Sequence, residues 1–158
     1  MKFTLTTKNV LFISFLVGLT IRIVIELQSV YPIGEDVSLY NYVLELYLHK
    51  LDWDLLYLGS PLIYLIGFGA KTLTNIDGFT LWKFISPVLN GLVGLSFAFF
   101  LVKGLKWSLR KTLFSVVFFL LYFVQILFSN GLFSQQLATV FFFLALTLKL
   151  LNKNLQIF

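Results

Sequence analysis

Long apolar runs are the feature that most constrains how this chain folds. Five such runs follow one another through its 158 residues. A helix that crosses a bilayer needs about 20 mainly apolar residues, and about 17 at the short end. The runs reach this length alone or with flanking residues at 9–29, 84–102, 112–129 and 136–152, and a further run occupies 55–73.

Composition identifies the solvent in which these runs fold. Apolar residues make up 59% of the chain, charged residues only 12%, and the mean hydropathy is +0.92. These values lie outside the range of soluble domains of this length. The sequence therefore predicts an all-α polytopic transmembrane helix bundle. Residues 1–158 are expected to form a single membrane domain, because neither a linker nor a repeat divides them.

Charge distribution indicates which runs cross the membrane. All seven acidic residues lie between positions 26 and 77. Cytoplasmic loops carry an excess of Lys and Arg. The basic residues that stand apart from acids are Lys2, Lys8, Lys103, Lys106, Arg110, Lys111, Lys149 and Lys153. If all five runs crossed, the patch at 103–111 would face outward, whereas a run 55–73 that begins and ends outside makes every such patch cytoplasmic.

The charge pattern therefore predicts about four crossings, with 55–73 as a helix that does not cross. We expect an integral, multi-pass membrane protein with a cytoplasmic N-terminus. Its first external loop would hold two juxtamembrane helices, at 36–49 and 55–73. The glycines and proline within 55–73 weaken a straight spanning helix, although both residues occur in real transmembrane helices.

The stretch after the first run predicts an amphipathic helix at 36–49. Its polar side chains recur at helical spacing and face away from its apolar and aromatic ones. The polar set is Ser38, Asn41, Glu45 and His49, and the apolar set is Leu39, Tyr40, Val43, Leu46 and Tyr47. Aromatic residues favour the membrane interface. Two adjacent carboxylates, Glu35 and Asp36, fall at the helix N-terminus, where Asp is a preferred N-cap.

Several motifs in this order resemble the N-terminal part of GT-C glycosyltransferases, which are polytopic enzymes that use polyprenyl-phosphate-linked sugars. The resemblance rests on the Pro-Ile-Gly-Glu-Asp element at 32–36, the aromatic helix after it, and "SPLIYLIGFGAKTL", which looks like the family's Pro-Leu-Tyr-Tyr juxtamembrane element. The segment "LFSNGLFSQQLATVFFFLALTL" looks like the second external loop of the family and the helix after it.

The resemblance implies a sugar transfer on the outer side of the membrane from a lipid-linked donor. Asp36 matches the acidic catalytic residue of the family and would be the general base, with Glu35 as the second choice. A carboxylate in a partly desolvated cleft beside the bilayer can have a raised pKa and so be a better base. The alternative is that Asp36 only caps the helix.

Arg22 is a candidate for binding the donor phosphate. It lies inside the first crossing, where ionisable residues are costly and often functional. The alternative is that its side chain snorkels outward and pairs with Glu26, one turn away. No metal site can be assigned: the chain has no cysteine and one histidine, and "SNGLFSQQ" lacks the second acidic residue of many family members. Whether a divalent metal is a cofactor stays open.

Members of the family have roughly twice as many helices or more, so the resemblance implies that this chain alone lacks part of the donor site and is inactive by itself. The alternative function is a small non-enzymatic membrane protein or transporter fragment, with the acidic loop as a solvated or ion-attracting surface. Nucleic acid is not an expected partner, because the basic patch at 103–111 is most simply a membrane anchor. Trp53, Trp82 and Trp107 fall near predicted interfaces, where tryptophans form aromatic belts.

Overall fold

A computed structural model of the chain describes residues 5–30, 32, 37–49, 61–130 and 133–155, and for 47–49, 123–130 and 153–155 it describes the backbone alone. Every regular element in these ranges is helical, so the predicted all-α fold is confirmed. The elements are α1 (Thr7–Glu26), α2 (Val37–His49), α4 (Pro61–Thr74), α5 (Gly78–Phe99), the π-helical turn η1 (Phe100–Gly104), α6 (Leu109–Asn130) and α7 (Phe133–Leu155).

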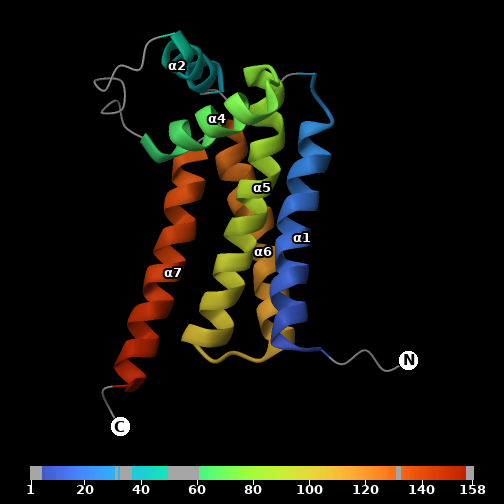
Figure 1. The fold of residues 1–158 in the computed structure, drawn as a ribbon. Coiled ribbons are helices and arrows are strands. Elements are labelled where there is room, and N and C mark those ends of the chain that lie inside the picture. The colour runs from blue at the N-terminus through green and yellow to red at the C-terminus, as the bar shows by residue number, and fades with distance from the viewer. Residues whose placement is uncertain (1–4, 31, 33–36, 50–60, 131–132, 156–158) are drawn as a thin grey trace.

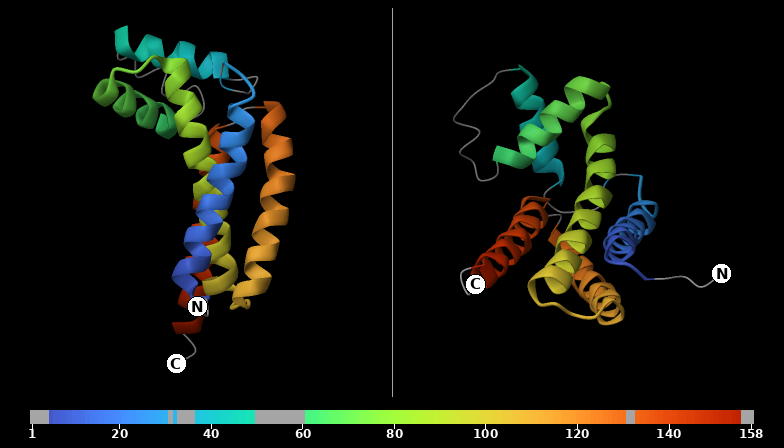
Figure 2. Two further views of the ribbon diagram at one scale, coloured as in Figure 1. Left: turned by 90° about the vertical axis from the view of Figure 1, so that its right-hand side faces the viewer. Right: turned by 60° about the horizontal axis from the view of Figure 1, so that its bottom comes forward.

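The long helices α1, α5, α6 and α7 form a bundle, and α2 and α4 lie across one end of it (Figure 1). We call α2 and α4 together the cap. Successive long helices alternate in direction, so the start of α1 and the end of α7 both lie at the end opposite the cap (Figures 1 and 2). The helix predicted over 36–49 is present as α2, whereas 55–60 of the helix predicted over 55–73 lie outside the described residues.

Helix length and composition identify this as a membrane protein. Three segments are long and apolar enough to cross a bilayer, namely Thr7–Glu26 (20 residues), Gly78–Gly104 (27 residues) and Phe133–Asn152 (20 residues). The remaining predicted crossing, 112–129, falls within the 22 residues of α6, which lies beside these segments. In contrast, the 14 residues of α4 span only about 21 Å at 1.5 Å per residue, less than the roughly 30 Å of a hydrocarbon core.

The corner between α4 and α5 turns the chain from the cap into the bundle. Asn75 adopts a left-handed conformation with φ of 54°, and its N–H donates to the Lys71 carbonyl at 2.8 Å. Asparagine tolerates this conformation better than most residues. Asp77 then caps α5 by accepting a hydrogen bond from the Thr80 N–H at 3.0 Å. A C-cap and an N-cap in immediate succession therefore fix the angle between the two helices.

Close contact between α1 and α5 organises the bundle. A Cβ atom added at Gly18 would lie 2.5 Å from the Asn90 carbonyl oxygen, and one added at Gly94 would lie 2.6 Å from the Ser14 carbonyl oxygen. The Asn90 side-chain amide also donates to the Gly18 carbonyl at 2.7 Å. Small residues that let backbones approach, together with interhelical hydrogen bonds, hold membrane helices together. The two helices are therefore locked in one antiparallel register.

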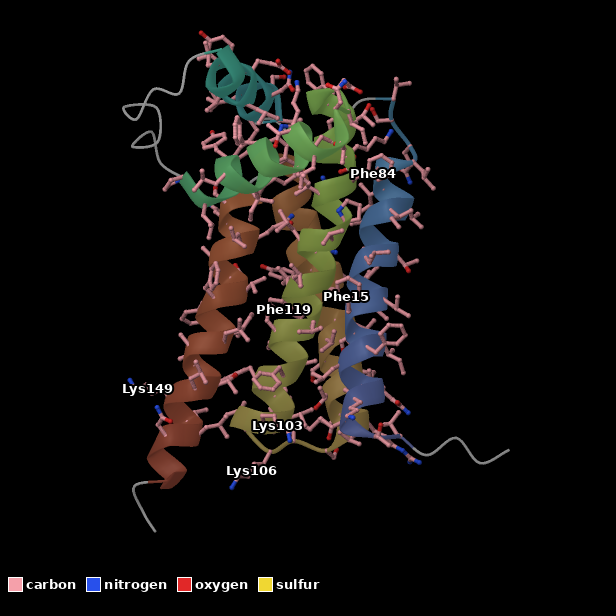
Figure 3. The ribbon with its side chains drawn as sticks, viewed as in Figure 1. Phe15, Phe84, Lys103, Lys106, Phe119 and Lys149 are labelled. Carbon is pink, nitrogen blue, oxygen red and sulfur yellow. The ribbon has the colours of Figure 1, made fainter. Side chains whose placement is uncertain are left out.

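Phenylalanines join α5, α6 and α7 in the half of the bundle farther from the cap. The Phe97 ring lies 4.3 Å from that of Phe119 and 4.9 Å from that of Phe143, measured between centroids. The Phe119 and Phe143 rings meet edge to face at 5.7 Å. Figure 3 shows Phe119 in the interior of the bundle. These separations fall in the range that favours aromatic pairs, so the cluster ties α6 and α7 to the central α5.

Gly18→Ala is expected to destabilise the bundle, because its new methyl group would collide with backbone that cannot turn away. Overpacking of this kind costs about 1–3 kcal/mol. Gly69→Ala is the matched control: a Cβ atom there meets nothing within 4 Å, and alanine is the better helix former by up to about 1 kcal/mol. Thermal unfolding in detergent should therefore show a lower Tm for Gly18→Ala and an equal or higher Tm for Gly69→Ala.

Candidate functional site

Tyr40 joins the cap to the bundle. Its ring lies 5.5 Å from Tyr64 in α4, 5.6 Å from Trp82 in α5 and 5.1 Å from Phe133 in α7. Its hydroxyl lies 2.9 Å from the Ser134 hydroxyl and accepts a hydrogen bond from the Ser134 N–H at 3.3 Å. One side chain of α2 therefore contacts three other helices.

Trp82 is a core residue and does not belong to an interfacial belt, contrary to the sequence prediction. It is fully buried and its ring stacks on Phe133 at 5.4 Å. Gly67 makes room for it, since a Cβ atom there would lie 2.7 Å from the indole. Trp107 is partly buried, with the Lys111 ammonium 3.9 Å from its ring centroid. Trp53 lies outside the described residues.

The buried face of α2 agrees only in part with the predicted apolar face. Tyr40 and Val43 of that face are buried, as are Val37 and Leu44, whereas Leu39 is exposed. The polar residues Asn41 and Glu45 face the start of α5, because their side-chain oxygens lie close to Gly78. The helix therefore turns part of its polar side toward the protein. This placement is possible because α5 begins with a glycine, which leaves space for the Asn41 amide.

Charged groups at this corner are matched with partners. Lys71 in α4 forms an ion pair with Glu45 in α2, which ties the two cap helices together. The Thr80 hydroxyl and N–H donate hydrogen bonds that lower the pKa of Asp77, so this carboxylate stays ionised at neutral pH. Each acidic residue that the structure describes therefore has a local partner. Glu45 pairs with Lys71, Asp77 caps α5, and Glu26 pairs with Arg22 in α1.

Glu35 and Asp36, the candidate catalytic acids, lie outside the described residues. The helix after them is described. α2 begins at Val37, directly after Asp36, and Val37 is only 2% exposed. The first residue of α2 is thus anchored in the core cluster formed by the cap and the ends of α5 and α7.

Arg22, the candidate phosphate ligand, is buried inside the bundle. Its guanidinium lies 2.6 Å from the Glu26 carboxylate, and the two side chains are 1% and 3% exposed. The i, i+4 pairing expected from the sequence is present, but the side chain does not snorkel outward. Because Glu26 already balances the charge of Arg22, a phosphate would have to compete with this carboxylate.

Two further buried polar residues lie at the level of Arg22. The Asn90–Gly18 hydrogen bond sets the register of α1 and α5. One helical turn from this bond toward the cap, α1 carries Arg22 and α5 carries Ser86. The Trp82–Phe133 stack sets the register of α5 and α7. One turn from this stack away from the cap, α5 carries Ser86 and α7 carries Gln136. Arg22, Ser86 and Gln136 therefore lie at about the same height on three helices, and we call them the polar layer.

The polar layer holds unused hydrogen-bonding capacity. Ser86 and Gln136 are 0% and 2% exposed, and the Ser86 Oγ and Gln136 Oε1 atoms have no hydrogen-bond partner among the described residues. The same holds for Oδ1 of Asn90, one turn farther from the cap. Buried polar atoms in proteins are nearly always hydrogen-bonded to protein or water. The Ser86 hydroxyl can donate and accept a hydrogen bond, and the Gln136 Oε1 atom can accept one. Their partners could be hydroxyl groups, amide groups or water molecules.

Sequence reasoning missed this layer, although the residues leave a trace in the apolar runs. Ser86 and Asn90 interrupt the run 84–102, and Gln136 begins the run 136–152. Neutral polar residues are common enough in membrane helices that such interruptions alone do not mark a site. Their meeting at one level depends on helix register, which the sequence does not reveal.

The described residues offer no metal site, since they contain no group of three or more His, Cys, Asp or Glu side chains able to hold an ion. No protein-family model matches the chain, and comparison with curated proteins and with solved structures finds no match either. Its function must therefore be argued from the residues and their arrangement.

Tyr40→Phe is expected to loosen the cap, because it removes the hydroxyl that meets Ser134 and keeps the ring. A lost hydrogen bond of this kind costs roughly 1 kcal/mol, and the Tm should fall accordingly. Tyr42→Phe is the matched control on the same helix, since Tyr42 is 62% exposed. Equal Tm values for the two variants would show that the Tyr40 hydroxyl does not hold the cap on the bundle.

Proposed function

We propose that this chain is the N-terminal membrane portion of a GT-C-type glycosyltransferase that transfers a sugar from a polyprenyl-phosphate-linked donor to an acceptor on the outer side of the membrane. The observation that carries the proposal is the cap. A first long helix is followed by two helices, α2 and α4, that lie across one end of the bundle, in the order expected for the first external loop of that family. The absence of any matching family leaves this a fold-level analogy.

Charge placement supports the orientation that this function needs. The labelled lysines Lys103, Lys106 and Lys149 lie at the end opposite the cap (Figure 3). The described acids Glu26, Glu45 and Asp77 lie at the cap end or at the adjoining end of α1. Under the positive-inside rule, the end with lysines faces the cytoplasm. The proposed topology is thus multi-pass, with a cytoplasmic N-terminus and an external cap.

In this proposal Asp36 is the general base. It would take the proton from the acceptor hydroxyl as the oxygen attacks the sugar carbon and the bond to the donor phosphate breaks. A base must be held in place to work, and Val37, the residue after Asp36 in the sequence, is buried in the core. Arg22 is proposed only as an indirect contributor, because Glu26 occupies its guanidinium.

The alternative is a non-enzymatic membrane protein or transporter fragment with an ion-attracting acidic surface. The described part of that surface does not favour it. Glu45 is paired with Lys71, Glu26 is paired with Arg22, and Asp77 caps α5. Of the described acids, Glu26 and Glu45 therefore have their charges balanced by ion pairs, and only Asp77 carries an unpaired negative charge.

Cysteine labelling tests the orientation, and the chain has no native cysteine to interfere. Single cysteines at the exposed positions Ser38, Asn75 and Ser108 should react with a membrane-impermeant thiol reagent in intact cells at the first two positions only. After the cells are opened, Ser108→Cys should react as well. Labelling of Ser108→Cys and protection of Asn75→Cys in intact cells would reverse the topology.

Asp36→Asn tests the catalytic proposal in cells whose own copy of the gene has been disrupted. Disruption should abolish a sugar transfer from a lipid-linked donor, and a complete wild-type version of the enzyme should restore it. Asp36→Asn in that complete version should lower the restored rate by about a hundredfold to ten-thousandfold. Asparagine remains a good N-cap, so folding should be unchanged. Glu35→Gln is the control and should restore transfer. Full activity of Asp36→Asn would leave only the capping role, and unchanged transfer after disruption would favour the non-enzymatic alternative.

A further inference from the structure

An apolar groove runs along the outside of the α1–α5 contact, near the cap. Its volume is about 370 Å³, and it is lined by Leu19, Ile23, Glu26, Leu27, Lys83, Phe84, Pro87 and Val88. Figure 3 shows Phe84 beside α1 at this end of the bundle. Leu27 and Phe84 are 75% and 64% exposed. The groove therefore opens sideways, toward the space that lipid fills around a membrane bundle.

The lining of the groove favours a hydrocarbon occupant. Its walls are mainly apolar side chains from α1 and α5, and lipid hydrocarbon is the solvent around membrane helices. One acyl chain of a lipid suits such walls.

Lys83 supplies a positive charge at one side of the groove. Its ammonium donates hydrogen bonds to the Ser29 and Val30 carbonyls just beyond the end of α1, the latter at 3.2 Å. An ammonium has three N–H groups, and these two carbonyls engage two of them. No carboxylate among the described residues forms an ion pair with Lys83, and the Glu26 charge is balanced by Arg22.

We propose that this groove binds one acyl chain of an anionic membrane phospholipid, with the lipid phosphate at the Lys83 ammonium. The apolar walls hold the chain, and the Lys83 ammonium, which pairs with no carboxylate among the described residues, favours a negatively charged headgroup. The bound lipid would fill the outer side of the α1–α5 contact in the leaflet nearer the cap. This site does not depend on sugar transfer and would exist in a protein with no enzymatic activity.

Native mass spectrometry of the full chain, released from nanodiscs that contain equal amounts of phosphatidylglycerol and phosphatidylcholine, tests the site. Wild type should retain phosphatidylglycerol with about a fivefold preference, which is the expected effect of one lysine near an anionic lipid surface. Lys83→Gln should remove the preference and Lys83→Arg should keep it. Lys103→Gln is the matched control, because Lys103 is an exposed lysine at the opposite end of the bundle.

Val88→Trp tests the groove without touching Lys83. Val88 is 45% exposed, so the indole can fill the groove without entering the core, and bound lipid should fall while circular dichroism stays that of wild type. The assignment is overturned if Lys83→Gln keeps the preference, if Lys103→Gln lowers it equally, or if Val88→Trp retains lipid as wild type does. Complete displacement of phosphatidylglycerol by an equal amount of polyprenyl phosphate would also overturn the choice of a bulk phospholipid as occupant.

Discussion

The close approach of α1 and α5 is the contact on which the rest of the structure depends. Between membrane helices the hydrophobic effect offers little, because lipid tails are as apolar as the side chains. Gly18 and Gly94 instead bring backbone to within van der Waals distance, and Asn90 adds an interhelical hydrogen bond. With this register fixed, the position of every other side chain along the two helices is set.

Both polar features of the bundle arise from that register. On the inner side, it sets Arg22 level with Ser86, and the Trp82–Phe133 stack brings Gln136 to the same height. On the outer side, it brings Lys83 to the carbonyls beyond the end of α1 and leaves the apolar groove below. The contact is tight at the glycines, and nearer the cap the groove lies along its outer side.

The sequence was sufficient for the helical class and for the approximate bounds of the long helices, because run length and apolar content determine these directly. It was also sufficient for the Arg22–Glu26 pair, which depends only on local spacing. It failed for Trp82 and, in part, for the buried face of α2, where Leu39 is exposed. Both depend on which helix covers which face: an interfacial tryptophan and a buried one look alike until Gly67 of α4 is seen to leave room for the indole. The polar layer could not be predicted from the sequence for the same reason, because its residues come from three helices whose relative register is set by tertiary contacts.

Aromatic side chains connect the cap to the polar layer. Tyr40 contacts Trp82 and Phe133, and the next polar residues on those two helices toward the membrane interior are Ser86 and Gln136. A shift of α2 would therefore move the rings of Trp82 and Phe133, which lie between α2 and the polar layer. Because Val37 is buried in the same cluster, the first turn of α2, the Trp82–Phe133 stack and the polar residues one turn below that stack are tied together through Tyr40.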